Sequence, residues 1–397
     1  MRNIRVRGLF TIAAASVLFI LPAVASVAQL IDITVMTQNL YLGADASPIL
    51  KATNLDDLQA AIVGARDSVV ANDFPLRAEA IASEVATRAP LLIGLQESEI
   101  VSESDAPQPL NYADTLIAAL RALGLNYAYK IVGLEDAVHT GFTLDSAVAG
   151  IFNPRFTLTD QEVVLVRTDV PNFTIKSISA RTFANDEIVV NPLFGQFALK
   201  RGYVLVDASL DGVPFQFVST HLAGTHDSLE PAEVDEILTA LGTTDERQLV
   251  VGDFNARPDE VCGGSPCGPK QMLAAGFTDT GPGLGSTCCQ SPTLDNPSSL
   301  NNRYDYIFER GFRAISSAAL VGDQPFEAER PLWPSDHAGV TATIAEVAGT
   351  PGFSNCLGVS ISTLSQQFGN SLDAAAKVLG FSDVRALRNA VRAFCRL

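Results

Sequence analysis

Six short polar clusters punctuate the apolar, strand-like runs of this sequence, from the first such run to the last. A single cluster of this kind is common, because Asp, Asn and Ser favour the turns that follow strands. Six in series indicate one composite site built from segments far apart in the chain. The clusters are Thr37–Asn39, Gln96–Glu97, Ser219–Leu222, Gly252–Asn255, Arg303–Tyr306 and Trp333–Val340.

Between residues 30 and 347 the pattern alternates β-branched runs with a smaller number of helical stretches. Many strands joined by hairpins, with few helices between them, favour two stacked mixed sheets over an alternating βαβ fold. Helices are predicted at 77–88, 112–123 and 232–241. Strands are predicted at 31–37, 91–95, 147–152, 161–167, 174–179, 203–210, 213–219, 248–251, 303–308 and 339–344.

The first 25 residues have the features of a secretory signal peptide. Three arginines precede an apolar stretch at 9–21, and Ala-Val-Ala at 23–25 matches a small-residue cleavage site. The apolar stretch is shorter than the ~20 residues that a membrane span needs, and no later segment is long and apolar enough. We therefore expect a secreted, extracellular or periplasmic protein with no stable membrane span.

The chain is strongly acidic, with a net charge of −17 at pH 7, and cleavage would remove three arginines. The electrostatic field of this negative charge repels a polyanion at long range. A nucleic-acid substrate would therefore require divalent cations or a local basic patch. Small substrates require neither.

Cysteine usage in an exported chain favours disulfides over a metal cluster. Neighbouring cysteines pair with each other only under strain. We therefore expect cross-loop bridges from Cys288 and Cys289 to Cys262 and Cys267.

A second unit is predicted at the C-terminus. The sequence Gly-Thr-Pro-Gly at 349–352 marks a boundary, and residues 355–397 follow a helical period and are net positive. Cys356 and Cys395 bracket this segment and are expected to close it. Three arginines between 385 and 392 share one helix face, which is either a solvated face or an anion-binding surface.

Two clusters place carboxylates after apolar strands. Glu97 follows 91–95, and Asp253 and Asn255 follow the run that begins at Leu249. A hard cation such as Mg²⁺ needs one or two fixed carboxylates and otherwise keeps its water. The i, i+2 spacing sets a carboxylate and an amide on one side of an extended chain.

Two of the four histidines, His221 and His337, lie at predicted strand ends within the clusters. Their pKa near neutrality suits general acid and base catalysis. The chain has no G-x-S-x-G, Walker A, H-E-x-x-H or G-x-G-x-x-G motif. The sequence therefore gives no support for a serine hydrolase, a P-loop NTPase, a zincin or a nucleotide oxidoreductase.

In this order, the clusters resemble the endonuclease/exonuclease/phosphatase family, which includes deoxyribonucleases, repair nucleases, bacterial sphingomyelinases and inositol phosphatases. The resemblance covers roughly residues 30–347. It implies a four-layer α/β/β/α sandwich, a divalent metal ion (Mg²⁺, or Mn²⁺ or Ca²⁺) and in-line hydrolysis of a phosphate ester. The residues that carry it are Asn39, Glu97, His221, Asp253, Asn255, Asp305, Asp336 and His337.

The resemblance also implies a metal site and a nucleophile site. Glu97 is expected to be the principal metal ligand, with Asn39 and Asp336 beside it. Asp253 and Asn255 are expected to orient the attacking water and the phosphate.

The remaining roles concern protons and charge. His337, held by Asp305, is expected to act as a general base or a phosphate-binding cation, and His221 as a general acid or a stabiliser of the leaving oxygen. Arg201 lies where deoxyribonuclease-like members have a phosphate-contacting arginine.

These expectations describe a secreted, metal-dependent phosphodiesterase, with a nuclease or general phosphodiesterase favoured over a sphingomyelinase or phospholipase C. The substrate would be a nucleic acid or a phospholipid head group. A non-catalytic binding or adhesion protein on the same scaffold is the alternative of another class. The sequence leaves open the substrate, the preferred metal, the general base, the disulfide connectivity, the role of the C-terminal segment and the oligomeric state.

Overall fold

The computed structural model describes residues 31–103, 106–129, 138–145, 156–193, 195–225, 227–242, 247–327 and 331–396. The predicted signal peptide at 1–25 and the predicted strand at 147–152 lie outside the described residues. Among the described residues, no helix combines the length and the apolar character needed to cross a membrane.

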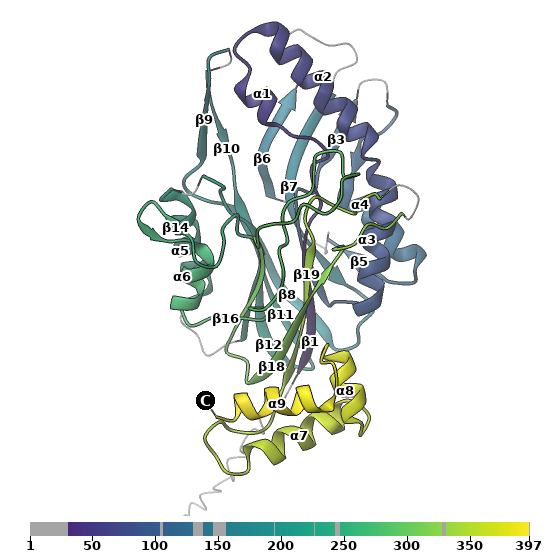
Figure 1. Ribbon diagram of the computed structural model, residues 1–397, viewed down its shortest axis with the longest axis vertical. Coiled ribbons are helices and arrows are strands. Elements are labelled where there is room, and N and C mark those ends of the chain that lie inside the picture. Colours follow the sequence, from purple (N-terminus) through teal and green to yellow (C-terminus); the bar gives the residue numbers. More distant parts are fainter. Residues whose placement is uncertain are drawn as a thin grey trace, which may run out of the picture.

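Two mixed sheets form the centre of the molecule (Figure 1). The first sheet has the order β18-β19-β1-β2-β7-β3-β4, with β5 and β6 also paired to β7. Its strands are β1 (Asp32–Asn39), β2 (Leu92–Gln96), β3 (Ile100–Glu103), β4 (Leu110–Asn111), β5 (Tyr127–Ala128), β6 (Val138–Asp145), β7 (Phe156–Arg167), β18 (Ala314–Val321) and β19 (Gly339–Glu346).

The second sheet has the order β16-β17-β13-β12-β11-β8. Its strands are β8 (Phe173–Thr182), β11 (Gly202–Leu210), β12 (Val213–His221), β13 (Arg247–Asp253), β16 (Thr278–Asp279) and β17 (Asp305–Arg310). Two small ribbons pair β9 (Glu187–Asn191) with β10 (Gly195–Leu199) and β14 (Val261–Cys262) with β15 (Ser265–Pro266).

Helices cover the outer faces of both sheets (Figure 1). One flank carries α1 (Ser47–Lys51), α2 (Leu55–Ala71), α3 (Phe74–Arg88) and α4 (Tyr112–Ala122). The other flank carries α5 (Leu229–Leu241) and α6 (Gly268–Ala274). The C-terminal segment forms α7 (Cys356–Gln367), α8 (Leu372–Val378) and α9 (Val384–Phe394).

Three apolar clusters separate these layers, because successive side chains of a strand point to opposite faces. Val35 of β1 and Phe217 of β12 are buried in the cluster between the sheets. Met36, the next residue on β1, packs with the α2–α4 flank, and Val218 of β12 packs with the α5–α6 flank. The predicted four-layer α/β/β/α sandwich is confirmed.

Strand register decides where the polar clusters meet. β1 and β2 are parallel, with Asn39 opposite Gln96. β12 and β13 are also parallel, with His221 opposite Asp253, and the antiparallel β17 begins with Asp305 opposite Asp253. The polar ends of both sheets therefore lie along one edge of the sandwich.

The C-terminal helices pack beyond the other ends of these strands (Figure 1). Leu364 of α7 and Leu387 of α9 share an apolar cluster with Ile315 of β18 and Ala345 of β19. The segment therefore docks on the sandwich, and part of its core is built from sheet residues.

Polar contacts place this segment at the start of β1. The Gln367 side-chain amide donates to Asp32 Oδ1 and to the Glu346 carbonyl, both at 3.1 Å. The predicted Cys356–Cys395 disulfide is present, with Cα atoms 5.7 Å apart. Because Asp32 and Asn39 lie at opposite ends of β1, roughly 23 Å of extended chain separates the helices from the polar edge.

The predicted cross-loop disulfides are wrong. Cys262 pairs with Cys267, and Cys288 pairs with Cys289. The β14–β15 hairpin folds the chain back and brings the Cα atoms of Cys262 and Cys267 to 5.0 Å. Cys288 lies elsewhere, where its backbone bridges to His337, so the two pairs do not meet.

Candidate active site

Asn39 joins the two sheets at the polar edge. Its Nδ2 donates to Glu97 Oε1 at 3.0 Å and to Asp253 Oδ2 at 3.1 Å, and its Oδ1 accepts from the backbone N of Tyr41 at 2.9 Å. A backbone N–H can only donate, so this contact determines which way the amide points. Asn39 therefore holds two carboxylates in place, and its role as a metal ligand stays a prediction.

Glu97 and Asn255 follow β2 and β13 with left-handed backbone, at φ 50° and 51°. Such a conformation costs a non-glycine residue about 1–3 kcal/mol and persists where surrounding contacts enforce it. Glu97 Oε2 accepts from the Leu42 backbone N at 2.8 Å, and Asn255 N donates to Asp253 Oδ1 at 2.8 Å. These turns direct both side chains into the polar edge.

His337 is held as a cation. Its Nδ1 lies 2.8 Å from Asp305 Oδ2 and 3.7 Å from Asp253 Oδ2. Burial acts to lower the pKa of His337, but the carboxylates of Asp305, Asp253 and Asp336 outweigh burial and raise this pKa well above its usual value. A raised pKa favours the protonated imidazole, which suits the phosphate-binding role better than the role of general base.

His221 has the opposite charge state. Burial, Arg201 and His337 hold its pKa well below the usual value. Arg201 Nη1 lies 2.9 Å from His221 Nδ1, and a guanidinium can only donate, so Nδ1 accepts this hydrogen bond. His221 Nε2 lies 3.6 Å from Asp253 Oδ2 and 3.0 Å from Asn255 Nδ2, which also donates to the Leu222 carbonyl at 2.9 Å.

Asp336 and His337 lie on a loop that is tied to β1. The Ser335 hydroxyl donates to the Asn39 carbonyl at 2.7 Å and accepts from the His337 backbone N at 3.2 Å. The loop that carries two candidate site residues is thus fixed to the strand end that carries a third.

Arg77, which the sequence reasoning did not single out, ties the same loop from the other side. The fully buried guanidinium donates to the carbonyls of Leu40 (2.6 Å), Pro334 (2.9 Å), Asn72 (3.0 Å) and Tyr41 (3.2 Å). The sequence offered one signal of this role, because Arg77 falls among the apolar positions of a predicted helix.

A buried network below the polar edge was also missed. The Ser219 hydroxyl donates to Glu162 Oε1 at 2.6 Å, and Gln96 Nε2 donates to the same oxygen at 3.2 Å. Burial raises the pKa of Glu162 well above its usual value. Glu162 lies inside the long strand β7, where no local pattern separates it from an exposed strand residue.

The donor set of the edge fits a hard divalent cation. Burial raises the pKa of Asp336 to about 7, with Glu97 and Asp253 adding to the shift and His337 opposing it. Carboxylates crowded in this way are stabilised by a cation, and carboxylate oxygens are the ligands that Mg²⁺, Mn²⁺ and Ca²⁺ take. Asp253 and Asp305 also belong to a compact group of possible ligand atoms.

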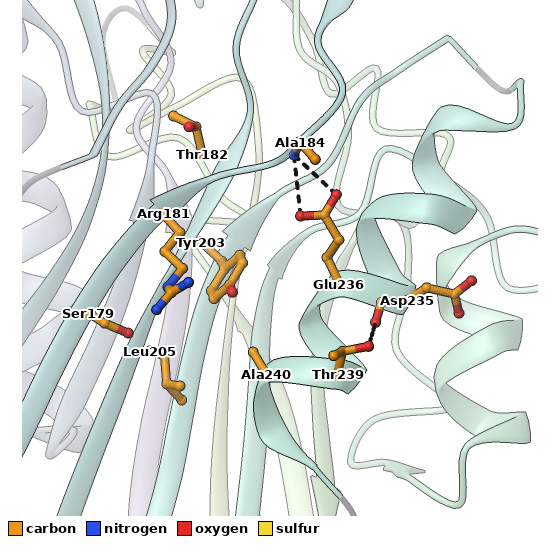
Figure 2. A pocket seen from close by; sticks show the side chains of 10 residues that line it. All are labelled: Ser179, Arg181, Thr182, Ala184, Tyr203, Leu205, Asp235, Glu236, Thr239 and Ala240. Carbon is orange, nitrogen blue, oxygen red and sulfur yellow. Dashed lines mark hydrogen bonds between the residues drawn. The ribbon is translucent and has the colours of Figure 1, made fainter.

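A hollow of about 530 Å³ lies between β8, β11 and α5 (Figure 2). The Glu236 carboxylate is occupied there by the Ala184 backbone N, at 3.1 and 3.2 Å. None of the candidate site residues lines this hollow, so its size does not mark the chemistry. Its lining is Ser179, Arg181, Thr182, Ala184, Tyr203, Leu205, Asp235, Glu236, Thr239 and Ala240.

A two-sheet sandwich with carboxylates, amides and two histidines along one edge defines the class of α/β/β/α phosphoesterases. Residues 36–337 match the Endonuclease/Exonuclease/phosphatase family, and the chain belongs to this family, whose members are phosphoric ester hydrolases. The resemblance seen in the sequence is therefore confirmed.

Solved structures share the fold at low identity. An endonuclease/exonuclease/phosphatase family protein from Bacteroides thetaiotaomicron has a TM-score of 0.51 at 16% identity, over 80% of this chain and 95% of that chain. Truncated TDP2 from Caenorhabditis elegans has a TM-score of 0.45 at 18% identity, over 79% and 97%. A mannosyl-6-phosphatase from Bacteroides thetaiotaomicron has 0.48 at 17%, over 79% and 99%. No curated protein sequence matches.

Proposed function

We propose that this protein is a secreted, divalent-metal-dependent phosphodiesterase, of the nuclease or general phosphodiesterase type. The observation that carries the proposal is a pair of histidines on either side of Asp253, with His221 Nε2 and His337 Nδ1 at 3.6 and 3.7 Å from the same carboxylate oxygen. The surroundings raise the pKa of His337 well above its usual value and hold the pKa of His221 well below it. Neighbouring titratable groups whose pKa values are pushed apart are typical of sites that divide phosphate binding from proton transfer.

Glu97 and Asp336 would hold the metal ion. When bound, the ion supplies positive charge to the non-bridging phosphate oxygens and lowers the pKa of a coordinated water. Asn39 keeps Glu97 oriented through its 3.0 Å hydrogen bond.

Asp253 is the group placed to receive a proton from the attacking water. Burial raises its pKa to about 6, with His337 opposing and Asp305 adding to the shift. A base with a pKa near the working pH is effective. Asn39 and the backbone N of Asn255 occupy one oxygen each, which fixes the carboxylate plane.

The other side chains stabilise charge on the phosphate. His337 would contribute positive charge beside Asp253, and His221 would donate a proton from Nε2 to an ester oxygen. Arg201 orients His221 through Nδ1. Direct contact of Arg201 with the phosphate is part of the proposal.

A substrate panel tests the proposed activity. Bis(p-nitrophenyl) phosphate, DNA, RNA, sphingomyelin and inositol phosphates are offered with Mg²⁺, Mn²⁺ or Ca²⁺, with and without EDTA. We expect metal-dependent p-nitrophenol release that EDTA abolishes. Turnover confined to sphingomyelin would favour the phospholipase C alternative. Binding without turnover of any ester would favour the non-catalytic scaffold.

Substitution of Glu97 is expected to weaken metal binding. Glu97→Gln should raise the Mg²⁺ concentration for half-maximal activity at least about tenfold, and excess Mg²⁺ should recover part of kcat. Titration of activity against Mg²⁺ measures this shift. The exposed Glu79→Gln is the matched control and should leave the titration unchanged. An unchanged Mg²⁺ requirement in Glu97→Gln would remove Glu97 from the metal site.

Removal of residues 349–397 is expected to lower stability without lowering turnover. The deletion exposes Ala345 and Val347, which are fully buried, and exposing one aliphatic side chain costs roughly 1.5–3 kcal/mol. Tm should fall, whereas kcat on a small soluble ester, per folded molecule, should stay unchanged.

The full chain with Arg385→Ala and Arg388→Ala is the control for this deletion. It keeps the apolar contacts and should keep the original Tm. If the basic face is functional, both proteins should bind anionic vesicles less well. Loss of turnover in a folded truncation would show that the segment helps to build the site.

A further inference from the structure

A line of exposed arginines runs along α9, the last helix of the C-terminal segment. Arg385, Arg388 and Arg392 are three and four residues apart, so they share one side of the helix, and Arg396 follows four residues later. At a rise of about 1.5 Å per residue, the first three span about 10 Å of the helix. We call these four residues the basic face, and all of them are exposed.

The charge of the basic face is not compensated within the molecule. In the part of the chain that the structure describes, none of its guanidinium groups is paired with a carboxylate. Arg392 Nη1 donates to the neutral Asn389 Oδ1 at 3.3 Å, and Asp383 is occupied as the helix cap by the Ala386 backbone N. In a chain with a net charge of −17, unpaired arginines on one face favour an anionic partner outside the molecule.

The opposite side of α9 is already in use. Leu387 and Val391 are fully buried in the apolar cluster that the helices share with Ile315 of β18 and Ala345 of β19. A helix that lies in a lipid surface inserts its apolar side between the head groups, and this side of α9 is not available for insertion. The basic face therefore points away from the sandwich and favours a hydrated polyanion over a membrane.

An exposed aromatic side chain lies at the end of the basic face. The Gly352 backbone N donates to the Cys395 carbonyl at 3.1 Å, so Phe353 and Arg396 directly follow the two joined residues. Phe353 is 66% exposed. Sites for single-stranded nucleic acid combine positive charges that follow the phosphate backbone with aromatic rings on which bases stack.

We propose that the basic face and Phe353 form a second binding site for a single-stranded nucleic-acid substrate, separate from the catalytic edge. The inference rests on the proposed nuclease function and narrows its substrate to long strands. The site supplies the local basic patch that such an acidic protein requires for a polyanionic substrate.

The position of the site sets the length of the strand. Roughly 23 Å of extended chain in β1 separates the C-terminal helices from the polar edge. This distance corresponds to at least about seven nucleotides of a stacked strand. A longer strand can contact both sites, whereas a small ester reaches the catalytic edge alone.

Binding of a fluorescein-labelled single strand of about 20 nucleotides, which exceeds the length that both sites require, tests the proposal. Fluorescence anisotropy is measured in EDTA, so that binding is followed without metal-dependent hydrolysis. In the full chain with Arg385→Gln, Arg388→Gln and Arg392→Gln, Kd at about 50 mM salt should rise at least about tenfold, and the slope of log K against log salt should become shallower by about 2. An unchanged Kd and slope would overturn the proposal.

Two further triple variants separate charge from structure. Lysine at the same three positions keeps the charge and should keep most of the affinity and the slope. A loss as large as that of the glutamine variant would show that charge is not responsible and would also overturn the proposal. The matched control removes equally many exposed charges elsewhere and should bind as the unmodified protein does. It carries Arg121→Gln, Lys176→Gln and Lys270→Gln.

The choice of nucleic acid over other anions has its own test. Phe353→Ala should weaken binding of the single strand and leave binding of inorganic polyphosphate, which has no bases, unchanged. An unchanged Kd for the strand would overturn the nucleic-acid assignment. Binding of anionic phosphatidylserine vesicles that the glutamine variant loses, while its strand binding is unchanged, would assign the face to a membrane instead.

Kinetics separate this inference from the proposed function. In the glutamine variant, KM for the strand should rise at least about fivefold with kcat unchanged, and kcat/KM for bis(p-nitrophenyl) phosphate should stay the same. An unchanged KM for the strand would overturn the second site. If no strand is hydrolysed with any metal, the nuclease function fails, and Kd in EDTA still decides whether the basic face binds nucleic acid.

Discussion

His337→Gln is expected to lower kcat on a phosphodiester by about 10²–10⁴-fold, and excess Mg²⁺ should not restore it. Glutamine occupies a similar volume but carries no charge, so the phosphate loses the cation that Asp305 and Asp253 hold in place. Steady-state kinetics at saturating Mg²⁺ measure the loss. Rescue by Mg²⁺ equal to that of Glu97→Gln would contradict the separate roles of these residues.

The pairing of His337 with Asp305 makes this prediction sharper. If the two act as a unit, Asp305→Asn should lose a large part of the same activity, and the double variant should be little worse than His337→Gln alone. Groups that act together give such non-additive losses. Multiplicative losses in the double variant would show that Asp305 acts independently of His337.

Arg77→Met is expected to lower the free energy of unfolding by about 3–5 kcal/mol, the range for removing one partner from a buried charged network. Four backbone carbonyls lose their donor, and two of them, of Leu40 and Pro334, belong to the loops that carry the site. Activity should fall with stability, because the Asp336 loop loses one of its two ties to the end of β1. Urea unfolding measures the first effect and kcat the second.

Arg121→Met, at an exposed position on α4, is the matched control and should change stability by less than about 0.5 kcal/mol. Arg77→Lys tests the geometry, because lysine keeps the charge but cannot direct donors to four separate carbonyls. A loss no larger than that of the control would show that the loops are held by other contacts.

Local patterns predicted most of the strands that build the site, because their apolar runs end in polar residues whose chemistry is visible in the sequence. β18 was missed. Its sequence, Ala-Ile-Ser-Ser-Ala-Ala-Leu-Val, has little β preference of its own, and it becomes a strand by pairing with β19 along its whole length. The helix α2 was also missed, although Asn54 caps it through the Asp57 backbone N.

Disulfide pairing and amide orientation depended on tertiary structure. The expected strain of a bridge between neighbouring cysteines argued against a Cys288–Cys289 disulfide. The hairpin pairs Cys262 with Cys267, however, so Cys288 and Cys289 pair with each other. The sequence also did not show that the Tyr41 backbone N turns the Asn39 amide nitrogen towards two carboxylates, and the role of Asn39 as a metal ligand stays a prediction. Both outcomes follow from neighbours that no local pattern reveals.

The sequence by itself determined the list of chemical groups and the edge at which they collect, since residue type and strand-end position are local properties. Tertiary structure alone decided the state of those groups. His221 and His337 look alike in the sequence, and their pKa values are shifted in opposite directions because one is buried beside Arg201 and the other beside Asp305. Burial and charged neighbours set a pKa, and both come from segments far apart in the chain.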